Sequence, residues 1–470
     1  MTWSEIALLG SIAPLLLALC APARARRPLV CAALVLVAGC AVAGLVSGPR
    51  WQWYPIAVGA LVMVALGVLR LWPSATGPEP RGRTRNTVIV LTLLLGLVAA
   101  TGGGAMAWAI PVPVFPVPSG PHPVGAVTAQ WTDPDREETW TDDPADRRTV
   151  VARIWYPAAP GADGERALYL GRDAREADIV AEGLAAGLGM PGFVLEDASR
   201  ARAHAVPDAP PVAGRHPLVL FSPGLGGVRT QNTVWAEGLA SHGYVVVAVD
   251  HPYDSAVVVL DDGTVVRGAL TATGDPEEDD RLADEWTRIR ADDLGLVLTR
   301  LVEEANADEG PLSGLVDPER VAMAGHSLGG AAALLAAAGD QRVDAVIDLD
   351  GLPRLPRGAS LSQPVLALVA AAGTGSPEGD VRYAVALDGV FAASTAPGHV
   401  LSVPGTAHLS FSDSPFLIPP FPSLVGSLGR AEPARITEAA SLAFLDATLK
   451  GADVDLDAAL APLGEVTPMP

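Results

Sequence analysis

The hydrophobic pattern divides the chain into two parts of different character. Four nearly unbroken apolar runs, at about 6–21, 29–46, 53–71 and 87–110, are each close to the roughly 20 residues that a helix needs to cross a bilayer. Beyond them, apolar strand-like runs alternate with amphipathic helix-like segments. We therefore predict an all-α transmembrane module of four helices over 1–110, followed by an α/β domain.

Loop charge predicts the orientation of this module. The loops at 23–28 and 81–85 contain three arginines each, whereas the middle loop contains only Arg50. Because basic loops stay in the cytoplasm, the N-terminus and everything after residue 110 should lie outside it. The first run is preceded by MTWSE, which has no positive charge, so we favour a span over a cleaved signal peptide. Five tryptophans fall at the ends of the predicted spans: Trp3, Trp51, Trp53, Trp72 and Trp108.

The remaining chain is predicted to contain a linker, a large domain and a short tail. Residues 111–148 combine a proline-rich extended connector with the acidic stretch DPDREETWTDDPADRR, which we interpret as a solvated loop or hairpin. The α/β domain covers 149–455, and 456–470 is the tail. Within the domain, 158–215 interrupts the strand and helix alternation, and it is either a lid or an ordinary surface-packed segment. PEEDD, at 276–280, reads as a solvated loop.

Continuous Val/Leu runs such as YVVVAV are typical of strands buried on both faces, which predicts a mostly parallel sheet. The strand candidates are 149–156, 217–222, 244–250, 320–324, 343–349, 363–369 and 399–403. The helix candidates are 229–241, 282–306, 328–338 and 434–450.

Composition excludes several classes of function. The chain has 53 acidic and 32 basic residues, which argues against nucleic-acid binding. All three cysteines, Cys20, Cys31 and Cys40, lie in predicted spans, so the α/β domain has no disulfide, thiolate nucleophile or cysteine-based zinc site. HExxH and P-loop patterns are absent, and we expect neither a metal nor an organic cofactor. The 31 arginines against one lysine, with many alanines, suggest a GC-rich bacterial genome.

The stretch VAMAGHSLGGAAALLAAAG contains a candidate nucleophile. Ser327 is the serine of a G-x-S-x-G pentapeptide that follows a strand pattern and precedes a helix pattern. A sharp strand-to-helix turn exposes such a serine, and the glycines on both sides permit the close backbone approach that the turn requires. Ser327 is therefore a candidate nucleophile, provided that a base and an acid accompany it.

A serine nucleophile needs a histidine and a carboxylate, which follow it in the order acid then histidine in this kind of fold. Only His399 and His408 lie downstream, and His408 is favoured because it follows a strand whereas His399 lies within one. For the acid we favour Asp350, at the end of VDAVIDLDG. Asp348 is the main rival, and Asp413 is a weaker one.

Backbone amides would have to stabilise the oxyanion. One donor is predicted at Leu328, directly after the nucleophile, and the other at Leu225 in the turn FSPGLGG. Three further residues could line the pocket: Gly224, Gly226 and His251.

Two buried polar residues are given structural roles. His326 is expected to pack under the turn rather than act as a base. Asp293 lies on the apolar stripe of a predicted helix, and we expect it to pair with an arginine such as Arg290 or Arg153.

These motifs together resemble one known family. FSPGLGG with RTQNTVWAEGLASHGYVVVAVDH, then GHSLGG, IDLDG and PGTAHLSFSD, resemble the α/β-hydrolases of the platelet-activating factor acetylhydrolase (plasma or isoform II) type, as do GPHPVGAV and ARIWYP. The resemblance covers about 115–450 and implies a calcium-independent serine esterase or lipase that acts on short or oxidised acyl chains of phospholipids. By position, the resemblance implies that the family's catalytic triad corresponds to Ser327, Asp350 and His408. This sequence departs from the family pattern at Pro223, where the family has histidine, and the resemblance does not include the membrane module.

We therefore expect an integral protein of a bacterial cell membrane whose extracytoplasmic α/β-hydrolase domain cleaves carboxylic esters of lipids or other small molecules. An envelope acyltransferase would use the same triad and differs only in its acyl acceptor. A non-catalytic membrane module with an inherited hydrolase fold is the alternative from another class.

Overall fold

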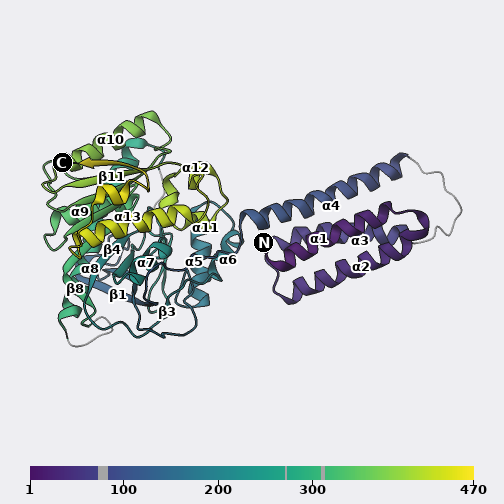
Figure 1. Cartoon of the computed structure of the whole chain (residues 1–470), viewed down its shortest axis with the longest axis horizontal. Coiled ribbons are helices and arrows are strands. Elements are labelled where there is room, and N and C mark those ends of the chain that lie inside the picture. The colour runs from purple at the N-terminus through teal and green to yellow at the C-terminus, as the bar shows by residue number, and fades with distance from the viewer. Residues whose placement is uncertain (72–82, 270–272, 308–312, 470) are drawn as a thin grey trace. The chain divides into compact units, whose positions relative to one another are not determined.

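The computed structural model describes residues 1–71, 83–269, 273–307 and 313–469. The chain forms two compact units, Met1–Val112 and Pro113–Pro470 (Figure 1). The first unit is helical, and the second contains a large twisted sheet with helices on both sides.

The first unit contains four helices within its described residues: α1 (Trp3–Cys20), α2 (Ala23–Val46), α3 (Trp53–Leu71) and α4 (Arg83–Ala109). Three of them have stretches long and apolar enough to cross a membrane, namely Trp3–Cys20, Arg24–Val46 and Thr87–Ala109. In α3 the apolar stretch Trp53–Leu69 is shorter. Length and composition thus support three of the four predicted spans.

Polar side chains are buried at the end of this bundle where α1 begins and α4 ends. Arg50 lies in the loop between α2 and α3, as predicted, where it donates to Glu5 at 3.0 Å and also bonds the carbonyl of Ile110. Trp3 and Trp108 are exposed, as expected of an aromatic belt, but Trp53 is buried within the bundle. Trp72 and Arg81 lie outside the described residues.

The second unit is built on a ten-stranded sheet with the order β12-β11-β10-β9-β8-β4-β5-β2-β1-β3. The strands from β5 through β4, β8, β9 and β10 to β11 run parallel, and β2 and β12 pair antiparallel at its two sides. The mostly parallel sheet flanked by helices confirms the predicted α/β-hydrolase fold. The strands of this sheet are β1 (Val124–Glu137), β2 (Arg147–Pro157), β3 (Val206–Pro207), β4 (His216–Ser222), β5 (Val245–Asp250), β8 (Val316–His326), β9 (Ala345–Leu349), β10 (Val365–Ala370), β11 (Gly398–Val403) and β12 (Glu465–Met469).

Side-chain alternation along the strands divides the core into two layers. In β4, Leu218 and Leu220 join one apolar cluster with α8, α9 and α10, whereas Val219 and Phe221 join a second cluster with α7, α13 and α14. Both faces of the sheet are therefore covered, as the continuous apolar runs predicted. The helices that cover them are α7 (Thr233–Ser241), α8 (Pro276–Asn306), α9 (Leu328–Gly339), α10 (Pro377–Ala392), α13 (Glu432–Thr448) and α14 (Leu456–Leu460).

The segment at 158–215 packs as short elements against a third apolar cluster. These are α5 (Ala174–Gly187), η1 (Gly192–Leu195), α6 (Glu196–Ser199) and β3. The smaller elements elsewhere are the hairpin β6 (Val257–Val259) with β7 (Val265–Arg267), η2 (His408–Phe411), α11 (Ser414–Leu417) and α12 (Pro422–Val425).

The acidic stretch after the connector belongs to the β1–β2 hairpin, one of the two forms predicted for it. Two other segments differ from their predicted form. The predicted tail contributes the edge strand β12. PEEDD is not a loop but the first turn of α8, where Asp275 caps the amides of Glu277 and Glu278 and Pro276 occupies the first turn. Acidic residues and proline are both favourable in the first turn of a helix. The same residues are common in solvated loops, so composition alone did not distinguish the two.

Asp293 is buried on α8 as predicted, but its partners are different. Arg148 donates two hydrogen bonds to it at 3.1 and 2.7 Å, and Arg136 and His251 also bond it. Burial alone would raise the pKa of Asp293, but Arg148 and His251 outweigh burial, so the pKa lies below its ordinary value. Arg290 pairs instead with Asp254. The partner is an arginine, as predicted, but neither of the two named ones: Arg153, although also on β2, donates to the carbonyl of Gly171.

Replacing Asp293 with asparagine should destabilise the second unit strongly. The change removes the carboxylate that accepts two hydrogen bonds from Arg148 and leaves Glu138 as the remaining counter-charge of this buried arginine. Breaking a buried ion pair in this way costs about 3–5 kcal/mol of unfolding free energy. Thermal and denaturant unfolding would measure the loss at neutral pH, where the depressed pKa keeps Asp293 charged. Asp292→Asn is the matched control, because Asp292 is the next residue along the chain and its side chain is 67% exposed. Equal stability of the two variants would contradict the assignment.

Candidate active site

Ser327 lies on a strained turn between β8 and α9. Its backbone has φ +57° and ψ −124°, which a residue with a side chain rarely adopts. A Cβ on Gly325 would stand 2.1 Å from the carbonyl oxygen of Gly329, and a Cβ on Gly329 would stand 2.0 Å from that of Ser222. Both glycines of the pentapeptide are therefore required for the turn to form, and the turn presents Ser327 to a cavity.

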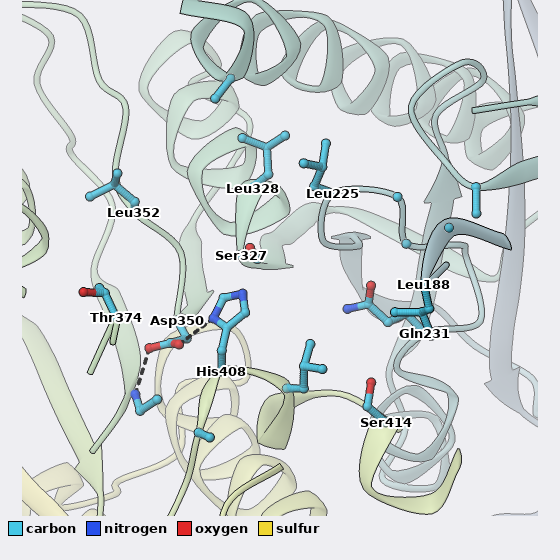
Figure 2. Close-up of a pocket in the computed structure, with 18 of the residues that line it drawn as sticks. Leu188, Leu225, Gln231, Ser327, Leu328, Asp350, Leu352, Thr374, His408 and Ser414 are labelled. Atoms are coloured by element: carbon cyan, nitrogen blue, oxygen red, sulfur yellow. Dashed lines mark hydrogen bonds and ion pairs between the residues drawn. The ribbon is translucent and has the colours of Figure 1, made fainter. Parts of the chain in front are cut away.

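His408 and Asp350 form a hydrogen-bonded pair at the same cavity. The Nδ1 of His408 lies 2.7 Å from the Oδ2 of Asp350. Because a carboxylate only accepts, Nδ1 carries the proton and Nε2 keeps a free lone pair. Figure 2 shows the imidazole ring between Asp350 and Ser327. Asp350 also accepts from the amide of Ala370 at 2.8 Å, which holds its carboxylate in place.

The three rival residues, Asp348, Asp413 and His399, are not among the residues that line the cavity. Asp348 is fully buried and accepts from the amide of Gly351 at 2.9 Å, and burial together with the charge of Asp350 raises its pKa well above the ordinary value. Asp413 is buried and accepts from the amide of Val234 at the start of α7. His399, on β11, pairs with Asp457 at 3.2 Å. The structure thus brings together Ser327, Asp350 and His408.

The loop 222–227 lies directly against the nucleophile turn. A Cβ on Gly224 would stand 3.4 Å from the Cβ of Ser327, and Leu225, Gly226 and Leu328 line the cavity. Among the described residues, no hydrogen-bond acceptor is found for the amide of Leu225 or for that of Leu328, the first residue of α9. Both amides are therefore available to a ligand. Gly224 itself is not among the residues that line the cavity.

His251 was predicted as a possible pocket residue, but it lies below the cavity. It is fully buried, with Nδ1 bonded to Asp293 at 2.8 Å and Nε2 to the hydroxyl of Ser222 at 2.9 Å. Burial lowers its pKa, which favours the neutral form. Two turn hydrogen bonds to its carbonyl, from Asp254 and Ser255, also hold it in place. His251 supports the loop 222–227 from beneath.

His326 connects the three loops of the site. Its Nε2 lies 2.9 Å from the carbonyl of His408, which can only accept, so Nε2 carries the proton. Its Nδ1 therefore accepts from the side-chain amide of Gln231 at 2.9 Å, and the Oε1 of Gln231 accepts from the amide of Gly224 at 3.0 Å. Sequence reasoning found His326 but missed Gln231, since nothing in RTQNTV distinguishes this glutamine from a surface residue.

The cavity has a volume of about 1650 Å³, larger than the roughly 300–1,000 Å³ of ordinary small-molecule sites. Its walls come mainly from α5, α8, α10 and the segment around α11, and they are largely apolar. Leu184, Leu188, Leu282, Trp286, Leu417 and Ile418 are among the lining residues. Within the described part of the chain, no group of three or more His, Cys, Asp or Glu could hold a metal ion. The arrangement suits an apolar ligand with one polar reactive group near Ser327.

A parallel sheet with a serine at its strand-to-helix turn, beside a histidine–carboxylate pair, defines an α/β-hydrolase. The model of the family "Platelet-activating factor acetylhydrolase, isoform II" matches residues 111–264 and 289–460, more than half of the chain. The chain belongs to this family, as its motifs predicted.

Similar proteins are named as esterases or acetylhydrolases. A probable 1-alkyl-2-acetylglycerophosphocholine esterase of Arthroderma benhamiae is 30% identical over 29% of this chain and 31% of its own length. The platelet-activating factor acetylhydrolase of Bos taurus is 31% identical over 29% of this chain and 35% of its own. The match thus spans about a third of either relative. The solved structure of a ferulic acid esterase from Streptomyces cinnamoneus has a TM-score of 0.60 and 30% identity, covering 75% of this chain and 98% of that one.

His326 should remain neutral throughout the pH range in which the protein is folded. Burial, and next the neighbouring His408, lower its pKa to about 3. Imidazole ¹⁵N NMR of selectively labelled protein between pH 4.5 and 8 should show a single neutral tautomer protonated at Nε2. Titration of His326 near pH 6.5 would contradict the hydrogen-bond chain described above.

Proposed function

We propose that this chain is a membrane-anchored serine esterase that hydrolyses carboxylic esters through Ser327, His408 and Asp350. The observation that carries the proposal is the Asp350–His408 hydrogen bond, in a cavity that Ser327 also lines. The amides of Leu225 and Leu328, for which the described residues provide no acceptor, lie at the same cavity. The family and the names of its relatives support an ester-cleaving reaction.

The proposed reaction has two stages, acylation of Ser327 and hydrolysis of the acyl-enzyme. The Nε2 of His408 takes the proton from the hydroxyl of Ser327 as that oxygen attacks the ester carbonyl, and Asp350 stabilises the resulting imidazolium. The amides of Leu225 and Leu328 donate to the oxyanion that forms on the carbonyl oxygen. His408 then returns the proton to the leaving alcohol, and water resolves the acyl-enzyme by the same steps in reverse. In this second stage His408 takes a proton from the attacking water and gives it to the oxygen of Ser327.

The proposed substrates are phospholipids with a short or oxidised acyl chain. Relatives named for an acetylated glycerophosphocholine support this class, and the large apolar cavity suits a lipid. Pro223 departs from the family pattern, and the structural neighbour is named for ferulic acid, so smaller esters are also proposed substrates.

The proposed location is the outer side of a bacterial cell membrane. The apolar helices of the first unit would anchor the protein, and the arginine-rich loops would stay in the cytoplasm. The second unit would then meet lipid substrates outside the cytoplasm.

Ser327→Ala should abolish ester hydrolysis and labelling by a fluorophosphonate probe, because the nucleophile is removed. The loss should be on the order of 10⁴-fold or more in kcat. Release of acetate, butyrate and palmitate from 4-nitrophenyl esters by the full chain in detergent would measure it, with the shortest chains turned over fastest. A folded wild-type protein that neither labels nor hydrolyses would exclude the proposed function.

Asp350 and Asp348 should respond very differently to the same substitution. Asp350→Asn should reduce kcat on the order of 10⁴-fold, because an amide neither stabilises the imidazolium nor enforces the reactive tautomer. Asp348→Asn should remain close to the wild-type rate, because burial already favours the neutral form of Asp348. Steady-state kinetics of both variants would test this, and the reverse ranking would move the acid to Asp348.

A further inference from the structure

Arg290 lies on α8, is fully buried, and contacts the loop 222–227 rather than a substrate-facing group. Its Nη1 donates to the carbonyl of Pro223 and, at 3.1 Å, to the hydroxyl of Ser222. Its Nη2 donates to the carbonyl of Gly224 at 3.0 Å. One guanidinium group therefore holds three consecutive residues of this loop.

Asp254 completes the arrangement from the next loop. It accepts from the Nε and Nη2 of Arg290 at 2.5 and 2.6 Å, so the two buried charges compensate each other. Its Oδ1 also accepts from the amide of Gly226 at 3.2 Å. The pair thus contacts the backbone on both sides of Leu225 while leaving the Leu225 amide without a partner among the described residues.

The planarity of the peptide bond fixes the direction of the Leu225 N–H relative to Arg290. In a trans peptide the carbonyl of one residue and the N–H of the next point in opposite directions, and the described chain contains no cis peptide. The carbonyl of Gly224 accepts from Arg290 at 3.0 Å and from the amide of Gly227 at 2.8 Å, so the N–H of Leu225 points away from both donors. Leu225 lines the cavity that contains Ser327, so this direction makes its N–H available there.

We infer that Arg290, held by Asp254, is a positioning residue that orients the Leu225 amide toward the oxyanion. The inference rests on the proposed function, because it assigns a role in that reaction. Arg290 touches no reacting atom; it acts through the Gly224–Leu225 peptide. A guanidinium is suited to this task because its five N–H donors make two hydrogen bonds to Asp254 and three to the loop, whereas an ammonium has only three donors.

The test compares Arg290→Lys with the wild type on 4-nitrophenyl butyrate and on its thiono analogue, in which sulfur replaces the carbonyl oxygen. Lysine keeps the buried positive charge but has only three donors, in place of the five hydrogen bonds that Arg290 makes to Asp254 and the loop. We expect kcat for the oxygen ester to fall about 10- to 100-fold with little change in KM, because an oxyanion donor acts mainly in the transition state. The preference for oxygen over sulfur should shrink, since sulfur is a weak acceptor and gains little from a well-aimed amide.

Arg153→Lys is the matched control, because Arg153 is also buried but donates to the carbonyl of Gly171 instead of the loop. It should lower Tm while keeping the oxygen-to-sulfur preference. Asp254→Asn serves as a second variant, since it weakens the support of Arg290 while preserving side-chain shape. It should reduce the same preference.

The outcomes separate this inference from the proposed function. If Arg290→Lys or Asp254→Asn loses Tm but retains the wild-type preference, Arg290 is only structural and the inference is overturned. If the wild type shows no preference for the oxygen ester, the Leu225 amide is not an oxyanion donor, and the inference fails even with the triad intact. Failure of the proposed function has a different signature: wild-type protein without fluorophosphonate labelling.

Discussion

Parallel pairing of β4, β8 and β9 is the constraint on which the site depends. Its register sets Ser222 beside Gly325 and Gly325 beside Asp348, so the three strands end at one edge of the sheet. The loop 222–227, the turn at Ser327 and the residue Asp350 therefore emerge next to one another. A shift of any of these strands would separate groups that lie far apart in sequence.

Strain is concentrated at that edge. Ser327 and Asp350 both have positive φ, and each directly follows a buried strand. Such backbones persist only where the surroundings hold them. Here the backbone amide of Ser327 donates to the carbonyl of Leu349, and the backbone amide of Asp350 donates to the carbonyl of Leu368. The sheet thus supports the strained residues through hydrogen bonds between neighbouring strands.

Buried charges beneath the site form a second layer of support. Arg290 with Asp254 holds the loop 222–227, and Asp293 with Arg148 orients His251, which reaches the hydroxyl of Ser222. Burying charges is costly unless each is paired and hydrogen-bonded, as these are. The acidic and basic residues of α8 thus contribute to the interior as well as to the surface.

The sequence by itself determined the features that depend on local pattern. Continuous apolar runs indicated the strands, the parallel sheet and the long helices of the first unit, and the pentapeptide with its flanking strand and helix made Ser327 the candidate nucleophile. Chain order and position after a strand were sufficient to favour His408 and Asp350, because strand ends in a parallel sheet share one edge. The acidic start of α8 was misread, because composition was considered without its capping signal.

Only the tertiary structure decided the partners of buried polar groups. Asp293 pairs with Arg148 from β2 rather than with its sequence neighbour Arg290, and His251 supports the loop instead of lining the cavity. Gln231 and Arg290 carry no local signal of their roles. Hydrogen-bond direction and ion pairing depend on which strands and helices become neighbours in space. The hydrophobic periodicity of a single segment does not indicate which other segment it will contact.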